Sequence, residues 1–485
     1  MLTGVIGVAL EDRKRILMVL SVTTLASFLT GFNARLAVVG IPTIAREVGA
    51  DVWSMVWIIQ GFMLGSTVFQ LVIGRVSDVY GRIRVFLAGV VVFTLGALMA
   101  GLSINPAMLI ASRIVQGCGG AILMNLSVTI LTDNVPPTRL ATWLGVNQVA
   151  WRAGALLGLT LSGIIIDYLG WHWIFLVQVP IGILVLMLSR RRLREAYTPV
   201  ESRKLDIGGF AAFTSFLALL LVGLTLSGYG YRELSLAFTA SSLVLLAAFT
   251  LLELKQENPA LDLRLFKIWQ FTGGIIAQLL YAIGFGASLT LLAIYMQSVK
   301  GYSPSYTGVL LIPYELSFLV SGLLGGRVAD IVGFAPATVA GLSFSAVALY
   351  MLSKASTLGS IIAGELVLGV GTGLFVAPNT SSIMTAVPPH RRGVASALRT
   401  VSFNVGFILS LNIAILAMTQ FIPYSTASQL ITRSEYVGEG SASTELLELE
   451  SAIKYSFLVQ AVVMAAAIPF SLSRIKLRRE SSKVH

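Results

Sequence analysis

Charged residues, cysteines and histidines are scarce in this chain. Of its 485 residues, 12% are charged and 56% are hydrophobic, whereas soluble domains carry about 25% charged residues. The single cysteine, Cys118, excludes internal disulfides and four-cysteine metal sites, and three histidines are too few to suggest a histidine metal cluster. So much apolar surface cannot be buried in a water-soluble core. The lipid bilayer is the solvent that tolerates it.

Patterns for common enzyme chemistry are also absent. No Gly-x-x-x-x-Gly-Lys-Ser/Thr segment occurs, so ATP hydrolysis is not expected. No serine, cysteine or histidine constellation points to catalysis, so the chain is predicted not to be an enzyme and to need no cofactor or metal. Residues Glu11–Arg15 precede an apolar run without a small-residue cleavage site, which predicts a membrane helix and not a cleaved signal peptide.

Long apolar segments recur along the whole chain. Fourteen of them can cross about 30 Å of hydrocarbon. They cover residues 16–39, 53–73, 85–104, 107–131, 141–166, 172–189, 207–228, 234–254, 270–297, 306–326, 336–354, 358–384, 394–418 and 453–473. The predicted fold class is an all-α integral membrane protein with fourteen transmembrane helices, embedded in the lipid bilayer.

Basic residues are distributed unevenly between the loops. Of 34 lysines and arginines, four lie within the apolar segments and six in loops on one side, which leaves 24 on the other side. The richer side faces the cytoplasm, so both termini are predicted there, in a multi-pass protein of the plasma membrane. The cluster Arg190–Arg194 is interpreted as a topological anchor near anionic lipid, and no nucleic-acid partner is expected.

Two motifs recur at one shared offset, which predicts an internal duplication. Gly74–Arg82 (GRVSDVYGR) returns 252 positions later as Gly326–Phe334 (GRVADIVGF). Val135–Arg139 (VPPTR) returns at the same offset as Val387–Arg391 (VPPHR). In an apolar chain, such a repeat is typical of transporters built from two halves.

The duplication predicts two pseudo-symmetric six-helix halves with a two-helix insert. The predicted parts are an N-terminal half at 1–189, a basic cytoplasmic linker at 190–206, two inserted helices at 207–254, a second cytoplasmic linker at 255–269, a C-terminal half at 270–473 and a basic cytoplasmic tail at 474–485. A polar external loop at 421–451 interrupts the second half, and a short helix is expected near Thr444–Lys454.

The stretch from Gly74 to Arg82 resembles motif A of the major facilitator superfamily, and fourteen helices resemble its drug:proton antiporter branch. This resemblance covers nearly the whole chain. Asp78 is expected to cap a helix and to pair with Arg82 or Arg84. The resemblance implies a clamp that holds one conformational state, and a fixed clamp without switching is the alternative. The predicted gating residues are Gly74, where backbones are expected to approach closely, Asp78, Gly81, Arg82, Gly326, Asp330 and Gly333, with Phe334 weakening the second copy.

Helices 4, 5 and 1 carry further resemblances and departures. Arg113–Gly120 in helix 4 resembles motif B, whose arginine the family links to proton transfer. Gly154–Gly163 in helix 5 keeps the glycine spacing of the antiporter motif, but Leu159 replaces its proline. In helix 1, Asn33 replaces the acidic residue of the drug exporters and Arg35 their threonine. These departures favour a transporter of organic anions or metabolites as the alternative.

Six charged residues lie inside the predicted spans, where charge is costly and usually functional. They are Arg35, Arg113, Arg152, Arg399, Glu315 and Glu365. The offset of 252 pairs Arg113 with Glu365, Arg152 with Asn404 and Asn147 with Arg399. Because equivalent positions in parallel repeats face one central cavity, these residues are expected to line it.

Membrane carboxylates are the candidates for proton coupling. Burial favours their protonated form and a nearby arginine their ionised form, so Glu315, Glu365 and Arg113 are the predicted group, with permanent salt bridges as the alternative. Arginines outnumber acids, which favours an anionic or zwitterionic substrate. The candidates for the substrate cavity are Asn33, Arg35, Gln60, Asn147, Arg152, Tyr281, Tyr314, Arg399 and Asn404.

The predicted function is secondary active transport by alternating access, with proton-coupled efflux of small organic compounds as the leading use. The first alternative is uniport or symport of organic anions or metabolites. The second is a non-transporting receptor, which the complete motif A and the membrane charges disfavour. The expected partners are a small-molecule substrate and protons, and the protein is expected to function as a monomer.

Overall fold

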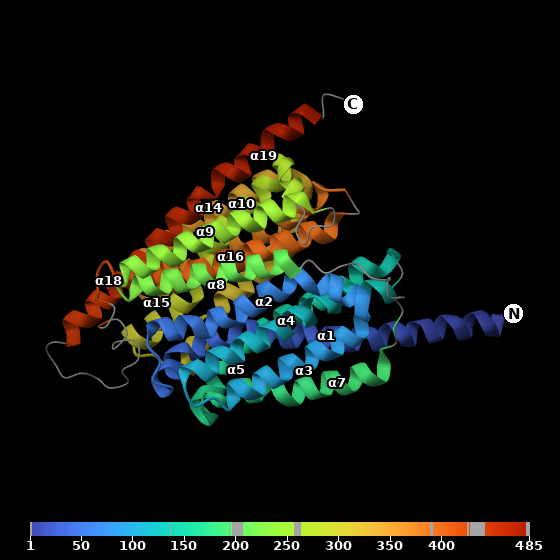
Figure 1. Cartoon of the computed structure of the whole chain (residues 1–485), viewed down its shortest axis with the longest axis horizontal. Coiled ribbons are helices and arrows are strands. Elements are labelled where there is room, and N and C mark those ends of the chain that lie inside the picture. Colours follow the sequence, from blue (N-terminus) through green and yellow to red (C-terminus); the bar gives the residue numbers. More distant parts are fainter. Residues whose placement is uncertain are drawn as a thin grey trace. The chain divides into compact units, whose positions relative to one another are not determined.

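The computed structural model consists of helices and the turns that connect them. It describes residues 2–135, 137–193, 195, 207–256, 263–388, 391–423, 426 and 442–481, and these ranges contain no strand. Fourteen helical segments in the described part are long and apolar enough to cross a membrane, as the sequence predicts (Figure 1). The fold is therefore that of an all-α, multi-pass membrane protein.

The first seven helices carry the first six spans. They are α1 (Leu2–Glu47), α2 (Val52–Tyr80), α3 (Arg82–Gly101), α4 (Pro106–Asn134), α5 (Pro137–Leu169), α6 (His172–Leu176) and α7 (Gln178–Arg192). Asn105 caps α4 by accepting a hydrogen bond from the Met108 N–H at 2.8 Å, and Pro106 follows at the first helical position. The sixth span is divided at Val177 into α6 and α7.

The inserted helices and the remaining six spans complete the chain. The inserted pair, α8 (Ile207–Gly228) and α9 (Arg232–Lys255), packs mainly against itself. The elements that follow are η1 (Leu263–Lys267), α10 (Trp269–Phe285), α11 (Ser288–Ile294), η2 (Tyr295–Val299), α12 (Pro304–Leu310), α13 (Ile312–Val332), α14 (Phe334–Lys354), α15 (Leu358–Thr385), α16 (Arg392–Met418), α18 (Ala442–Ala466) and α19 (Ile468–Ser481).

The chain divides into two compact units. The first comprises Met1–Gly40 and Trp57–Leu205, and the second comprises Ile41–Val56 and Asp206–His485. The turn between α1 and α2 thus belongs to the unit that holds the inserted pair. Tyr229, in the turn after α8, donates a hydrogen bond to Asp51 in that first turn. This contact joins the inserted pair to the turn between α1 and α2.

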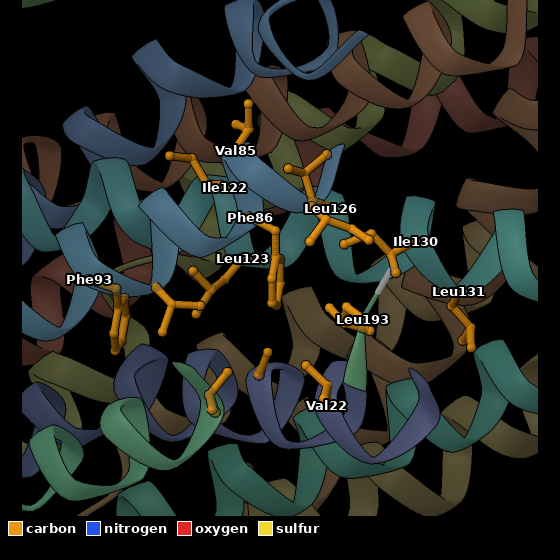
Figure 2. Close-up of a cluster of buried hydrophobic side chains, with 14 of the residues drawn as sticks. Val22, Val85, Phe86, Phe93, Ile122, Leu123, Leu126, Ile130, Leu131 and Leu193 are labelled. Atoms are coloured by element: carbon orange, nitrogen blue, oxygen red, sulfur yellow. The ribbon is translucent and has the colours of Figure 1, made fainter. Parts of the chain in front are cut away.

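The apolar core of the first unit lies where α1, α3, α4 and α7 meet. Phe86 of α3 and Leu123 of α4 are fully buried, and Val22 of α1 lies in the same cluster (Figure 2). Lipid is as apolar as leucine, so burying these side chains gains little hydrophobic free energy in a membrane. Close packing is what stabilises this cluster.

Glycines bring α3 and α4 into direct backbone contact. A methyl group added at Gly119 of α4 would lie 2.3 Å from the Phe93 nitrogen, and one at Gly96 of α3 would lie 2.6 Å from the Gln116 nitrogen. No side chain fits at such distances. The two helices therefore approach as closely as helices do at small-residue interfaces in membranes.

The last glycine of the repeated motif has the same backbone conformation in both halves. Gly81 has φ 94° and Gly333 has φ 95°, which residues with a side chain rarely adopt. Gly74 and Gly326 differ, because a methyl group at either would meet nothing within 4 Å. The close backbone approach expected at Gly74 is therefore not found, and the conformational demand lies at Gly81 and Gly333.

The first predicted span ended too early. It was placed at 16–39, but α1 continues through Pro42 to Glu47. Proline removes one helical hydrogen bond, and membrane helices tolerate this where neighbouring groups satisfy the freed carbonyl. The proline therefore does not end this helix.

The last span and the tail also differ from the prediction. The short helix expected near Thr444–Lys454 is continuous with the last span, since α18 begins at Ala442. Arg474, assigned to the tail, lies in the last span and is 2% exposed. Within the predicted external loop at 421–451, residues 424–425 and 427–441 lie outside the described residues.

The α3–α4 contact gives a stability prediction. Gly119→Ala should lower the unfolding free energy by about 1–3 kcal/mol, because the methyl group forces the backbones apart. Thermal unfolding of the detergent-solubilised protein, followed by tryptophan fluorescence, measures this. Gly145→Ala is the control, because its methyl group meets nothing within 4 Å. Equal midpoints for the two variants would contradict the packing argument.

Candidate functional site

Arg82 connects the ends of α2, α3 and α4. Its Nη1 donates to the two carboxylate oxygens of Asp133 at 2.5 and 2.6 Å, and its Nη2 donates to Asp78 Oδ1 at 3.1 Å. The pairing of Arg82 with Asp78 was predicted, whereas its pairing with Asp133 was not. Arg84, the alternative partner predicted for Asp78, has no hydrogen bond or ion pair with the described residues. The Arg82 side chain is 17% exposed, so solvent screens these ion pairs only in part.

Glu195 reaches the same cluster from the segment after α7. Its two carboxylate oxygens accept hydrogen bonds from the backbone N–H groups of Arg82, at 3.2 Å, and Ile83, at 3.0 Å. These N–H groups are free at a helix start, where the helix dipole also favours a carboxylate. The capping role expected of Asp78 thus belongs to Glu195. Gly81 leaves the space for it, because a methyl group there would lie 2.9 Å from the carboxylate.

The second copy of the motif lacks this cluster. Asp330 is exposed and has no hydrogen bond or ion pair with any described residue. The position of the arginine is taken by Phe334, which begins α14. Gly333 keeps the backbone conformation, but the ionic clamp itself occurs only in the first copy, among the residues that the structure describes.

Arg113 is enclosed by neutral groups inside the first unit. Its Nη1 donates to Asn33 Oδ1 at 2.9 Å and to Gln116 Oε1 at 2.5 Å, and its Nε donates to the Ile58 carbonyl at 3.2 Å. The guanidinium carbon lies 4.7 Å from the centre of the Phe62 ring, a cation–π distance. Arg113 is only 3% exposed, so its guanidinium is almost completely enclosed by the protein.

The polar chain continues from Arg113 towards the sixth span. Gln116 donates to Gln178 Oε1 at 3.2 Å, and Gln178 donates to the Ile174 carbonyl at 3.1 Å. These hydrogen bonds join α4 to α6 and α7. Asn33 supplies only a neutral oxygen to Arg113. The positive charge of Arg113 therefore has no acidic partner among the described residues.

Glu365, the repeat equivalent of Arg113, is buried without a partner. It lies in α15 at 0% exposure, and neither carboxylate oxygen has a hydrogen-bond partner among the described residues. Glu315 in α13 is 8% exposed and does have interaction partners. The two predicted proton-coupling carboxylates therefore lie in different environments.

Two further predicted residues, Arg399 and Asn147, also lack partners. Arg399 is a half-buried residue of α16, and its Nε has no acceptor. Asn147 of α5 is 2% exposed, and neither atom of its amide has a partner among the described residues. Arg35 and Arg152, in contrast, both have interaction partners.

The predicted aromatic and amide candidates pack inside their units. Tyr281 stacks on Phe285 with ring centres 5.5 Å apart, and Phe285 stacks on Tyr314 at 5.7 Å. Both tyrosines are at most 1% exposed, so they form part of the core of the second unit and not an open surface. Gln60 and Asn404 are buried as well, at 0% and 7% exposure.

A buried polar network in the second unit was not predicted. Arg474 of α19 donates to Asn379 Oδ1 at 2.9 Å, to Thr338 Oγ1 at 3.2 Å and to Ser471 Oγ at 2.8 Å. Asn379 donates in turn to the Gly274 carbonyl at 3.1 Å. The network joins α10, α14, α15 and α19. Arg474 ends an apolar run next to a basic tail, so its sequence gave no sign of burial.

The fold and the buried charges define a polytopic membrane transporter. No group of three or more His, Cys, Asp or Glu in the described residues could hold a metal. The family model of the Major Facilitator Superfamily matches residues 23–411 and 274–483. The chain belongs to this superfamily of transporters, and it is not an enzyme.

Known proteins of similar sequence and fold agree with this assignment. Riboflavin transporter RibZ of Clostridioides difficile is 30% identical over 81% of this chain and 86% of its own. Multidrug resistance protein Stp of Mycobacterium tuberculosis is 29% identical over 81% and 74%. The crystal structure of a bacterial homolog to the human lysosomal transporter Spinster has a TM-score of 0.67 at 15% identity, covering 95% of this chain and 97% of its own, and shows the shared fold.

The Arg82 cluster gives the first prediction for this site. Arg82→Gln should remove both ion pairs and lower the unfolding free energy by about 1 kcal/mol, a modest value because the groups are partly exposed. Thermal unfolding at low and high salt measures this, and the loss should shrink at high salt. Arg84→Gln is the matched control. A larger effect for Arg84→Gln would contradict the assignment.

The Arg113 network gives the second prediction. Arg113→Lys keeps the charge but loses the planar fork that reaches Asn33, Gln116 and the Ile58 carbonyl together. The free energy of unfolding should fall by about 1.5–3 kcal/mol. Thermal unfolding in detergent tests this against Arg190→Lys, whose side chain is exposed. A lysine variant as stable as the wild type would show that only the charge matters.

Proposed function

We propose that this transporter exports small organic compounds in exchange for protons. The names of its relatives support a small-molecule substrate, since one is a riboflavin transporter and another a multidrug resistance protein. We further infer a plasma-membrane protein that acts as a monomer with both termini in the cytoplasm. The uneven distribution of lysine and arginine supports this orientation of the termini.

Glu365 is the observation that carries the proton proposal. An ionised carboxylate buried without a hydrogen-bond or ionic partner is very costly, whereas the neutral acid costs far less. Glu365 is fully buried and both of its oxygens lack a partner among the described residues. A group in this position holds a proton while enclosed and releases it when water or a cation reaches it. This is the behaviour that alternating access requires of a proton carrier.

Glu315 and Arg113 have secondary roles in this proposal. Glu315 has interaction partners, whereas neither oxygen of Glu365 has one among the described residues, so Glu315 is the weaker proton candidate. Arg113 is held by neutral oxygens and by the ring of Phe62. We assign it the role of fixing α4 against α1 and α2, so that the first unit moves as one body.

A transporter of organic anions or metabolites, by uniport or symport, is the second candidate function. The observation that favours it is that Arg113 donates to the neutral oxygen of Asn33 and has no acidic partner among the described residues. Proton dependence separates the two, because uniport ignores a pH gradient.

Glu365→Gln tests the proton proposal. Purified wild-type protein in proteoliposomes should show flux of a fluorescent organic anion such as calcein that depends on an imposed pH gradient. Glu365→Gln should lose nearly all of this proton-driven flux, because an amide cannot carry a proton through the cycle. Exchange of dye across the membrane without a pH gradient should remain.

The control for this experiment is Glu233→Gln, an exposed acid at the start of α9. It should transport like the wild type. Proton-driven flux that survives in Glu365→Gln but disappears in Glu315→Gln would move the proton site to Glu315. Wild-type flux that ignores the pH gradient would remove proton coupling altogether.

A further inference from the structure

Arg399 carries five N–H donors inside a predicted membrane span, and none of them has a partner among the described residues. Its Nε is buried without an acceptor, and no ion pair involves it. An arginine that is left unsatisfied in a membrane is costly. Arg113 and Arg474 avoid this cost by donating to neutral oxygens. Arg399 therefore differs from the other buried arginines and needs an explanation.

Contact with lipid does not explain it. No residue of α16 from Val394 to Met418 is exposed, since the helix packs against α10, α15 and α18. Arg399 lies five residues inside the span that starts at Val394, which is about 7.5 Å along the helix axis. It is half-buried, as are Ser396 and Phe403 at positions i−3 and i+4 on the same face. Other helices cover part of each of these side chains, and the remaining part of each stays accessible.

The internal repeat supports a ligand-facing position. Asn147, the equivalent of Arg399 in the first half, is 2% exposed and also has no partner for either amide atom. Lipid-facing or purely structural positions would not keep unsatisfied polar groups in both copies. The same position is thus left free for a ligand in each half, and only the second half places a charge there.

The chemistry of the ligand follows from the side chains on this face of α16. A guanidinium pairs best with a planar acid through two parallel hydrogen bonds. Phe403, one turn along the same face, offers an apolar surface. Glu365, the one buried carboxylate shown to lack partners, is not in ion-pair contact with Arg399, so the arginine stays available to a solute.

We propose that Arg399 binds the carboxylate of an organic anion with an aromatic or apolar body, which this protein transports. This assignment rests on the proposed transport function and names its substrate class. Arg399 is the specificity-determining residue, and Phe403 contacts the apolar body. Glu365 keeps its separate role as the proton carrier.

Matched probes test this directly. Thermal stabilisation of the purified full-length protein is measured with 1-naphthoate, methyl 1-naphthoate and 1-naphthylmethylammonium, which share a ring and differ in charge, and with cinnamate and its methyl ester. The carboxylates should stabilise the wild type at lower concentrations than their esters or the amine. Arg399→Gln should weaken carboxylate binding about 10- to 100-fold, the value of charge-assisted hydrogen bonds, and leave ester binding unchanged.

Two more variants complete the design. Arg399→Lys keeps the charge but not the two-pronged geometry, and should bind carboxylates with intermediate affinity. Arg392→Gln removes an exposed arginine from the start of the same helix and should behave like the wild type. Wild-type protein that binds esters or the amine as well as the acids overturns the proposal, even if Arg399→Gln fails to fold. Equal carboxylate affinity in Arg399→Gln and the wild type also overturns it.

The outcome is separable from that of the proton experiment. Carboxylate binding that depends on Arg399, together with flux that ignores the pH gradient, would uphold the substrate class and reject proton coupling. Proton-driven flux of calcein that is lost in Glu365→Gln, together with no preference for carboxylates over their esters, would uphold the transport proposal and reject the role of Arg399.

Discussion

Polar groups inside a membrane have to be satisfied by the protein itself, because lipid offers no hydrogen bonds. This constraint organises both units. Arg113 draws its acceptors from α1, α2 and α4, and Arg474 draws its acceptors from α14, α15 and α19. Since these helices are distant in the sequence, each arginine fixes the relative positions of several helices. Backbone contact at glycines such as Gly119 then holds neighbouring helices close between these polar points.

The same constraint gives meaning to the groups that violate it. Glu365, Arg399 and Asn147 are enclosed by the fold and have no partner among the described residues. Such groups persist when a proton or a ligand satisfies them in another step of the cycle. The proton carriage proposed for Glu365 and the anion binding proposed for Arg399 thus follow from one principle. Their placement on different helices, α15 and α16, would let one protein couple two binding events without direct competition for a single group.

Sequence reasoning predicted the fold because its signals are local or strictly periodic. Apolar runs predicted fourteen spans, and the offset of 252 residues predicted that Gly81 and Gly333 are equivalent, which their shared backbone conformation agrees with. The polar contacts were harder to predict from the sequence, because they join residues far apart in the chain. Glu195 caps α3 from a segment more than 100 positions away, and it looked like part of a basic linker. Intramembrane position identified Glu365 and Arg399 as candidates, but only packing shows that Tyr281 and Tyr314 are core residues.

The two copies of the repeat differ in whether their polar side chains find partners. The first copy keeps the Arg82 clamp and places a fully engaged Arg113 where the second copy places the unsatisfied Glu365. A satisfied polar network resists change, because moving one member leaves several groups unpaired at once. An unsatisfied group carries no such penalty and gains from meeting a proton or an ion. The first unit thus has the character of a rigid scaffold around Arg113, whereas the second keeps rigidity at Arg474 and leaves Glu365 and Arg399 free for exchange. The opposite charges at the equivalent positions 113 and 365 are therefore the difference on which the proposed division of roles between the two units rests.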